Sequence, residues 1–327
     1  MLLVTGGAGF IGSNVVAALN DAGRGDVVVC DFLGHDGKWR NLAKRQLADI
    51  VPPAQLADWL KGGRKLDAVI HLGAISETTA TDGDLVIETN FRLSMRLLDW
   101  CTANAVRFIY ASSAATYGNG EQGFADDQSL AALRRLQPMN LYGWSKHLFD
   151  MAVIDRASRG GKMPPQWVGL KFFTVFGPNE YHKGTMMSVL ARRFADIKAG
   201  RAVQLFKSHR EGIADGEQRR DFIYVDDVVR VMIWLLATPG VSGLFNVGTG
   251  AARSFKDMML AAFSALGTAP NIQYIDMPEP IRGSYQYFTE SKVDRLRAAG
   301  YNGDFTPLEQ AVDTYVKGFL DRADRFR

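Results

Sequence analysis

The opening of the chain constrains its fold more than any other segment. An apolar run at residues 2–4 (LLV) leads directly into a glycine-rich segment, 5–12 (TGGAGFIG). A helical pattern of apolar residues follows as far as Leu19, and a second apolar run, 27–30 (VVVC), ends at Asp31. A strand, a glycine turn, a helix and a second strand that ends on an acid, all within about 30 residues, are typical of a dinucleotide-binding βαβ unit.

The alternation of strands and helices continues along the chain. We expect further strands at 68–72, 107–111 and 168–173, and helices at 88–104 and 142–159. Parallel strands need a crossover connection, which is usually a helix. The sequence therefore predicts an α/β fold with a doubly wound parallel Rossmann sheet.

The alternation of strands and helices ends after Thr174, where the sequence indicates loops rich in glycine and proline. We therefore expect two parts. Residues 1–173 form an NAD(P)-binding Rossmann domain, to which the apolar stretch 222–247 returns. Residues 174–221 and 248–327 form a smaller α/β lobe that binds the substrate.

The composition excludes several classes of protein. Of the 327 residues, 47% are hydrophobic and 22% are charged, which is unlike a disordered chain. The formal net charge is only +3, without a long block of either sign, so we expect neither nucleic acid nor a membrane surface as a partner. The two cysteines, Cys30 and Cys101, are too few for a disulfide framework or a four-ligand zinc site, and we expect no metal.

The location is predicted from what the sequence does not contain. No apolar run approaches the roughly 18 residues that a transmembrane helix needs. No basic stretch followed by an apolar one precedes the first expected strand, so we expect no secretion signal and a cytoplasmic protein.

The three glycines of the turn, Gly6, Gly9 and Gly12, have the spacing of a phosphate-binding loop. They allow a tight turn, the close approach of a pyrophosphate and close packing of the helix on the strand. Asp31 favours NAD, because an acid at this position binds the adenosine ribose hydroxyls. Lys38, with another basic residue close behind it, could instead neutralise the 2′-phosphate of NADP, so these residues leave the choice open.

A tyrosine and a lysine stand four residues apart at the start of the expected helix 142–159. Tyr142 and Lys146 share one helix face, and a nearby cation favours the phenolate, so we expect Lys146 to lower the pKa of Tyr142. Tyr142 could then act as a base. Ser113 follows the expected strand 107–111 at the carboxyl edge of the sheet, where ligands of such folds bind, and could hydrogen-bond the reacting oxygen.

Three motifs resemble one known family. Segments 5–12 (TGGAGFIG) and 112–118 (SSAATYG), together with the Tyr142–Lys146 pair, are similar to the extended short-chain dehydrogenase/reductase family of nucleotide-sugar enzymes. The likeness covers nearly the whole chain. The 4,6-dehydratases of this family carry an Asp-Glu pair where this chain has Ala114 and Ala115, so the general acid for eliminating water is absent and we do not expect dehydration.

Four segments narrow the resemblance to the ADP-glyceromanno-heptose 6-epimerases: 111–118 (ASSAATYG), 182–184 (HKG), 220–222 (RDF) and 245–250 (FNVGTG). The resemblance implies inversion of C6 of ADP-D-glycero-D-manno-heptose, giving ADP-L-glycero-D-manno-heptose, a precursor of the lipopolysaccharide inner core. It implies transient oxidation to a 6-keto intermediate with a tightly bound cofactor, NADP ahead of NAD. It also implies a homo-oligomer, which is a pentamer in described members.

The same resemblance assigns roles to individual residues. It implies two bases, Tyr142 for one pose of the sugar and Lys183 for the other, with Lys146 and Ser113 beside Tyr142. The cofactor-binding residues that it implies are Gly6, Gly9, Phe10, Ile11, Gly12, Asp31, Phe32, Lys38, Leu72, Gly73, Ala74, Ile75, Ser76, Thr89, Asn90, Lys146, Val175 and Lys183. The substrate-binding residues are Ser113, Thr174, Thr185, Arg192, Phe206, Lys207, Ser208, His209, Arg220 and Tyr285.

This chain departs from the family pattern at four positions. The family tends to have Asn, Lys, Asn and His where this chain has Phe32, Pro53, Thr174 and Arg192. Two other functions also stay open. A different nucleotide-sugar epimerase or reductase, such as one acting at C4 of a UDP-hexose, would use the same fold, whereas a non-catalytic dinucleotide sensor would need the tyrosine–lysine pair to be incidental.

Overall fold

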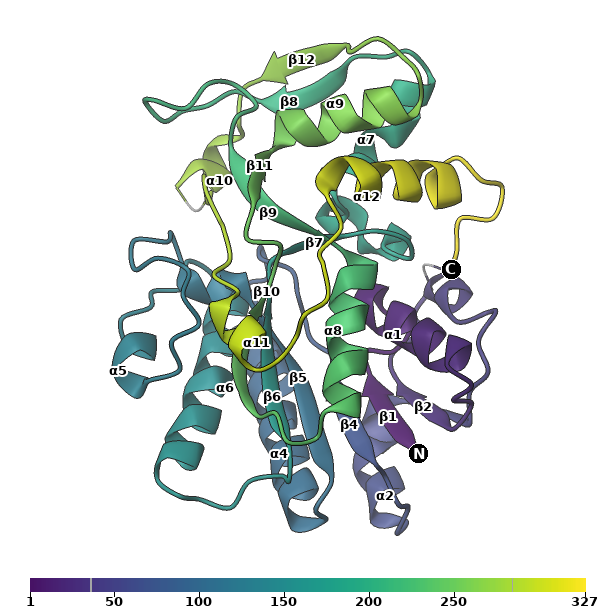
Figure 1. Ribbon diagram of the computed structural model, residues 1–327, viewed down its shortest axis with the longest axis vertical. Coiled ribbons are helices and arrows are strands. Elements are labelled where there is room, and N and C mark those ends of the chain that lie inside the picture. The colour runs from purple at the N-terminus through teal and green to yellow at the C-terminus, as the bar shows by residue number, and fades with distance from the viewer. Residues whose placement is uncertain (36, 284) are drawn as a thin grey trace.

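The computed structural model of the protein describes residues 1–35, 37–283 and 285–327. Its largest element is a seven-stranded sheet in which every neighbouring pair of strands is parallel. The strands lie in the order β10 (Gly243–Val247), β6 (Trp167–Phe172), β5 (Arg107–Ser113), β4 (Ala68–His71), β1 (Leu2–Thr5), β2 (Val27–Cys30) and β3 (Asp49–Val51). The predicted doubly wound parallel sheet is therefore confirmed (Figure 1).

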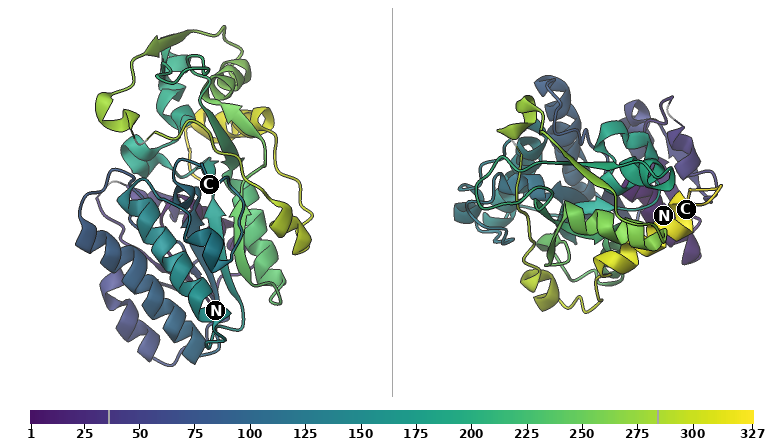
Figure 2. Two further views of the ribbon diagram at one scale, coloured as in Figure 1. Left: turned by 90° about the vertical axis from the view of Figure 1, so that its left-hand side faces the viewer. Right: turned by 90° about the horizontal axis from the view of Figure 1, so that it is seen from above.

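Helices cover both faces of this sheet, because successive side chains of a strand point to opposite faces. Leu2 and Val4 of β1 pack in one core with α1 (Phe10–Asp21) and α8 (Val225–Ala237). Leu3 packs in a second core on the other face. The helices of that face (Figure 2) are α2 (Leu56–Lys61), α4 (Leu93–Ala103) and α6 (Leu141–Ser158).

The elements expected in this part lie close to their predicted positions. The helix expected at 88–104 starts earlier, as α3 (Gly83–Val86), and passes through a π-helical stretch, Ile87–Arg92, before α4. Strand β3 was not predicted. It is an edge strand of three residues, and two of these are exposed, so it has no continuous apolar run.

Two small sheets lie beyond the carboxyl ends of the central strands (Figure 1). Their strands have three to six residues, and each contains partly or fully exposed positions, so none is a continuous buried apolar run like the four-residue β1, which explains why loops were expected there. One sheet has the order β11 (Ala252–Ser254), β9 (Arg219–Tyr224), β7 (Thr174–Phe176), and the other pairs β12 (Ile272–Ile275) with β8 (Val203–Phe206). The helices here are α7 (Val189–Lys198), α9 (Phe255–Ala265), α12 (Leu308–Tyr315) and the short α10 (Glu279–Arg282). The short α5 (Leu130–Leu133) lies against α6, and the short α11 (Asp294–Ala298) lies against β10.

The segment 222–247 contributes to both groups of strands. Its strand β10 lies in the central sheet, and its helix α8 packs on that sheet. Its first three residues, 222–224, are the last three of β9, which pairs with β7 and β11. The division into a Rossmann domain and a substrate-binding lobe stays a prediction.

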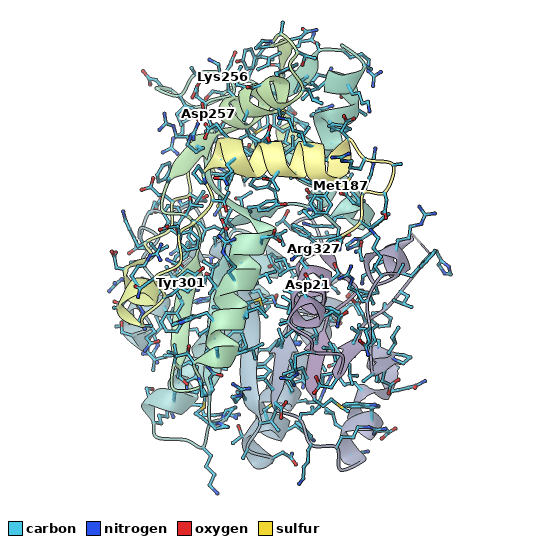
Figure 3. All side chains as sticks on the ribbon, turned by 45° about the vertical axis from the view of Figure 1, so that its right-hand side comes forward. Asp21, Met187, Lys256, Asp257, Tyr301 and Arg327 are labelled. Atoms are coloured by element: carbon cyan, nitrogen blue, oxygen red, sulfur yellow. The ribbon has the colours of Figure 1, made fainter. Side chains whose placement is uncertain are left out.

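Residues 325–327 pack between these two groups of elements. Arg327 lies beside Asp21 of α1, with Nη2 3.7 Å from Oδ2 (Figure 3). The backbone N–H of Arg327 donates to Asn179 Oδ1 at 3.0 Å, and Tyr181 OH donates to the carbonyl of Arg325 at 2.9 Å. These contacts attach residues 325–327 to the segment 179–181, which follows β7.

A fully buried ion pair joins β6 to α6. Lys171 Nζ lies 2.8 Å from Asp150 Oδ2 and donates to Thr116 Oγ1 at 2.6 Å. The carboxylate also accepts hydrogen bonds from Ser112 Oγ at 2.6 Å and from Tyr110 OH at 3.1 Å. Because water reaches neither charge, each depends on the other for compensation. The pair fixes α6 on the strands beneath it.

Removing one partner of this pair tests that dependence. We predict that Lys171→Met lowers the free energy of unfolding by about 3–5 kcal/mol, because it leaves the Asp150 charge buried without compensation. Urea denaturation measures the difference. The matched control, Lys171→Met with Asp150→Asn, removes both charges and recovers most of the loss. A single variant as stable as the unchanged protein would contradict this account.

Candidate active site

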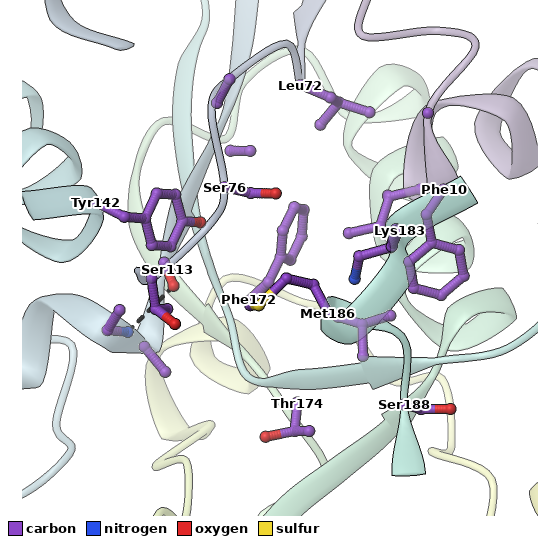
Figure 4. A pocket seen from close by; sticks show the side chains of 18 of the residues that line it. Phe10, Leu72, Ser76, Ser113, Tyr142, Phe172, Thr174, Lys183, Met186 and Ser188 are labelled. Atoms are coloured by element: carbon purple, nitrogen blue, oxygen red, sulfur yellow. Dashed lines mark hydrogen bonds between the residues drawn. The ribbon is translucent and has the colours of Figure 1, made fainter. Parts of the chain in front are cut away.

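A cavity of about 510 Å³ opens at the carboxyl edge of the central sheet. Its wall comes from the glycine turn, the ends of β4 and β5, the start of α6 and the segment after β7 (Figure 4). Since parallel strands present their carboxyl ends together, residues far apart in the sequence meet there.

The glycine turn is packed too closely for side chains. Gly6 has φ +67°, and a Cβ on it would lie 2.6 Å from the backbone nitrogen of Gly73. A Cβ on Gly12 would lie 2.1 Å from the carbonyl oxygen of Gly6. Helix α1 begins after Gly9 without a side-chain cap, so its first N–H groups are left for a ligand. These features fit the diphosphate of a dinucleotide.

The acid that follows β2 already has three hydrogen-bond partners. Asp31 Oδ2 accepts a hydrogen bond from the backbone of Ala8 at 2.9 Å, and Oδ1 accepts one from Lys38 Nζ at 2.7 Å and one from the backbone of Phe32 at 2.8 Å. Both Asp31 and Lys38 line the cavity, whereas Phe32 lies outside its wall with a side chain that is 66% exposed. The cavity thus presents a carboxylate for ribose hydroxyls and an ammonium for a phosphate side by side.

Helix α6 carries Tyr142 and Lys146 into the wall of the cavity. Asn140 caps the helix by accepting a hydrogen bond from Gly143 N at 2.8 Å, which fixes where the first turn begins. Burial lowers the pKa of Lys146 to about 8, while the charge of Asp150, four residues further on, opposes this shift. Ser113, at the end of β5, lies next to the Tyr142 ring (Figure 4).

The pKa of Tyr142 differs from the expectation. The sequence predicts that Lys146 lowers the pKa of the phenol, but burial of the hydroxyl raises it above its ordinary value. Hydrogen bonding with Ser113 lowers the pKa, and the negative charge of Asp150 raises it. The expectation was wrong because spacing along a helix gives no measure of desolvation.

Lys183 lies on the opposite wall of the cavity. It belongs to the 3-10 segment Tyr181–Met186, and its Nζ lies 5.2 Å from the centre of the Phe10 ring. Its amine and the Tyr142 hydroxyl both point into the cavity, from different sides (Figure 4). Burial lowers the pKa of Lys183, so its amine can exchange a proton nearer to neutral pH than an exposed lysine does.

His182 also lines the cavity. Burial lowers its pKa to about 4, and the positive charges of Lys38 and Lys183 contribute to the same shift. Its Nδ1 lies 3.3 Å from Asn41 Nδ2. His182 is therefore neutral near pH 7 and adds no charge to the wall.

Most of the predicted cofactor-binding residues and all four predicted catalytic residues line the cavity. Asn90 does not, but it holds the lining segment 72–76 in place: its Oδ1 accepts from Ile75 N at 2.8 Å and its Nδ2 donates to the Ile75 carbonyl at 2.9 Å. The predicted site residues in the wall are Gly6, Gly9, Phe10, Ile11, Gly12, Asp31, Lys38, Leu72, Gly73, Ala74, Ser76, Ser113, Tyr142, Lys146, Thr174, Val175, Lys183 and Arg192. Phe32, Ile75, Thr89, Asn90 and Thr185 lie outside it.

The residues expected to hold the nucleotide of the substrate lie together beyond the wall. The Arg220 guanidinium lies 5.1 Å from the centre of the Tyr285 ring and 5.6 Å from that of Phe255, which does line the cavity. The rings of Phe206 and Tyr285 are 6.4 Å apart. Of the other three, Lys207 lies 3.4 Å from Asp276, Ser208 N donates to Asp215, and His209 N donates to Tyr287 OH.

Several wall residues were not found from the sequence. Met186, Met187 and Ser188 lie within five residues after Lys183, so its segment could have suggested them. Gln286 and Thr289 come from a distant part of the chain and carry no pattern of their own. The buried Asp150 of α6 was also missed, although it stands four residues after Lys146 and thus on the same helix face.

The comparisons with known proteins now identify the relatives of this chain. Its sequence matches the NAD dependent epimerase/dehydratase family over residues 2–248. The chain belongs to this family. The family resemblance stated from the motifs is thereby confirmed.

Two curated relatives resemble this epimerase-family chain over its whole length. The ADP-L-glycero-D-manno-heptose-6-epimerase of Nitratidesulfovibrio vulgaris (strain DP4) is 49% identical over 100% of both chains. The protein of the same name from Fusobacterium nucleatum is 44% identical over 100% of both chains.

Solved structures of the family are similar as well. The Helicobacter pylori ADP-L-glycero-D-manno-heptose-6-epimerase superposes with a TM-score of 0.80 at 28% identity, covering 97% of this chain and 95% of that one. The Thermus thermophilus UDP-glucose 4-epimerase, solved in complex with NAD, has a TM-score of 0.74 at 26% identity, with 98% of this chain and 99% of that one covered.

Two further features of the described residues concern membrane-spanning helices and metal sites. None of their helices combines the length and the apolar character needed to cross a membrane. No group of three or more His, Cys, Asp and Glu side chains among them is arranged to hold a metal ion.

A methyl group at the glycine turn tests its role as the dinucleotide site. We predict that Gly12→Ala abolishes retention of a nicotinamide dinucleotide through purification, because the Cβ would collide with the Gly6 carbonyl. Absorbance and chromatography of the released nucleotide measure the occupancy. The matched control is Gly83→Ala, where a Cβ meets nothing within 4 Å. Equal occupancy in both variants would rule out this site.

Proposed function

We propose that the chain is an epimerase that inverts C6 of ADP-D-glycero-D-manno-heptose to give ADP-L-glycero-D-manno-heptose. The observation that carries this proposal is the placement of Tyr142 and Lys183 on facing walls of the cavity that also contains the glycine turn. Inversion requires proton transfer at the same oxygen in two poses of the sugar, and two groups on opposite walls provide it. The names of the full-length relatives at 49% and 44% identity support the choice of sugar.

An unactivated carbinol cannot be inverted by proton removal alone, because nothing stabilises the carbanion. The nicotinamide, when bound, supplies reversible hydride transfer that turns C6 into a ketone and back. The chain's own groups handle the proton of the 6-hydroxyl: Tyr142 with Ser113 on one wall and Lys183 on the other. Gly6, Gly12 and Asp31 would hold the dinucleotide on the edge of the sheet.

Within this proposal the cofactor is NADP. The support is the Lys38 ammonium, which neutralises Asp31 at 2.7 Å and faces the cavity, so that the edge of the sheet accepts the charge of a 2′-phosphate. A homo-oligomeric assembly and a cytoplasmic location stay predictions of the resemblance.

The substrate is tested by incubating the purified protein with ADP-D-glycero-D-manno-heptose and, separately, with UDP-glucose. We expect the ADP-heptose to convert to a mixture of its two C6 epimers and the UDP-glucose to remain unchanged at C4. NMR detects each change through the couplings of the C6 and C4 protons. Turnover of UDP-glucose alone would overturn the heptose assignment.

The two-base arrangement is tested by removing each group in turn. We predict that Lys183→Met and Tyr142→Phe each lower kcat by about 10²-fold or more, with fold and cofactor occupancy unchanged. Lys198→Met, at a lysine of α7 whose side chain is 60% exposed, is the matched control and keeps full activity. Turnover by Lys183→Met at the rate of the unchanged enzyme would remove the second base from the mechanism.

A further inference from the structure

Behind the wall that carries Lys183 lies a carboxylate with no exposed surface, Glu180. Its Oε2 accepts a hydrogen bond from Ser188 N at 2.6 Å, and its Oε1 accepts from Ser188 Oγ at 2.7 Å and from Tyr315 OH of α12 at 3.1 Å. Gly177 N lies 3.5 Å from Oε1. A buried charge with this many dedicated donors needs a reason beyond packing.

These contacts close the segment 181–187 into a loop. Glu180 stands immediately before it and Ser188 immediately after it, so one side chain joins the two ends. Ser188 in turn caps α7 by accepting from Ala191 N at 3.2 Å. Lys183, in the middle of the loop, also donates its backbone N–H to the Glu180 carbonyl at 3.0 Å. The position of the Lys183 amine in the cavity therefore depends on Glu180.

The surroundings of Glu180 also favour its negative charge. The backbone N–H of Ser188 can only donate, and its hydrogen bond, those of the Ser188 and Tyr315 hydroxyls and the charge of Lys183 all lower the pKa of Glu180, against the rise that burial causes. The charged groups that act on it are Lys183 from its own segment and Arg192 from α7. Lys183 is faced by Glu180, by the neutral His182 beside it and by the Phe10 ring of α1.

We propose that Glu180 is a positioning residue for Lys183, which places its amine in the cavity by closing the loop and keeps that amine protonatable by supplying a fixed negative charge. This inference rests on the proposed function for the role of Lys183 as the second base. Glu180 does not touch the substrate, since it lies behind the wall and not in it.

Two opposing effects then set the pKa of the Lys183 amine, and with it the pH range in which the amine can give and take a proton. Burial lowers its pKa, and the Glu180 charge raises it again. An amine without that charge would lose its proton at a lower pH and could no longer return it to the sugar oxygen efficiently. The closed loop adds a geometric requirement, because a displacement of about 1 Å at a proton-transfer group can cost about 10²-fold in rate.

The first test does not depend on turnover. We measure the reactivity of Lys183 toward trace acetic anhydride as a function of pH, by mass spectrometry of its peptide, in the holoenzyme. We expect Glu180→Gln to lower the midpoint pH of the Lys183 reactivity curve by about one pH unit. The matched control is Tyr315→Phe, which removes one hydrogen bond to the carboxylate but keeps its charge, and it should leave the midpoint in place. An unchanged midpoint in folded Glu180→Gln overturns the proposal.

The second test separates action through Lys183 from a general structural role. In the active enzyme we expect Glu180→Gln to lower kcat by about 10²-fold, whereas in a Lys183→Met background it should cause no further loss. An equal loss in both backgrounds would mean that Glu180 merely stabilises the fold, and would overturn the proposal.

A fallback covers a Glu180→Gln protein that does not fold. Ser188→Ala combined with Tyr315→Phe keeps the charge and removes both hydroxyl donors; we expect a kcat about tenfold lower with the midpoint of Lys183 unmoved. An unchanged kcat there would contradict the closed loop. If the unchanged protein fails to convert ADP-heptose, the proposed function fails, but the acetylation test still decides the effect of Glu180 on Lys183.

Discussion

The backbone of the glycine turn lies so close to the end of β4 at Gly6, and to the first turn of α1 at Gly12, that neither residue has room for a Cβ. These contacts set the first turn of α1 against β1 and β4, and they aim the first N–H groups of the helix at the carboxyl edge of the sheet. The rest of the site is assembled on the same edge, because β4, β5 and β6 run parallel to β1 and end there. Ser113 ends β5, and Tyr142 opens the helix that leads on to β6.

The two walls of the cavity share one electrostatic arrangement. On each wall an amine faces the cavity, and burial lowers its pKa: Lys146 on α6 and Lys183 on the segment after β7. Behind each amine lies a fully buried carboxylate that raises the pKa again, Asp150 and Glu180 respectively. Both carboxylates accept hydrogen bonds from hydroxyls, but Asp150 is also paired with a lysine, whereas Glu180 also accepts from a backbone amide. Charge behind each cavity wall therefore raises the pKa of an amine in that wall.

Much of this arrangement could be predicted from the sequence where the signals are local. The βαβ unit depends on neighbours in the chain, and so does the Tyr142–Lys146 pair on α6. Other features depend on contacts between distant segments, which a pattern does not encode. The sheet of β7, β9 and β11 pairs strands that are far apart in sequence, and Gln286 reaches the cavity from a segment without a motif. The raised pKa of Tyr142 follows from burial, which only the packed fold determines.

Under the proposed function, one sugar alcohol is oxidised and reduced again within the same cavity, and the hydrogen on its carbon is never released. This is tested by following ADP-D-glycero-D-manno-heptose that carries deuterium at C6 through conversion in ordinary water, by NMR and mass spectrometry. We predict that the inverted product keeps its deuterium at C6. Replacement of that deuterium by hydrogen from solvent would contradict the proposed mechanism.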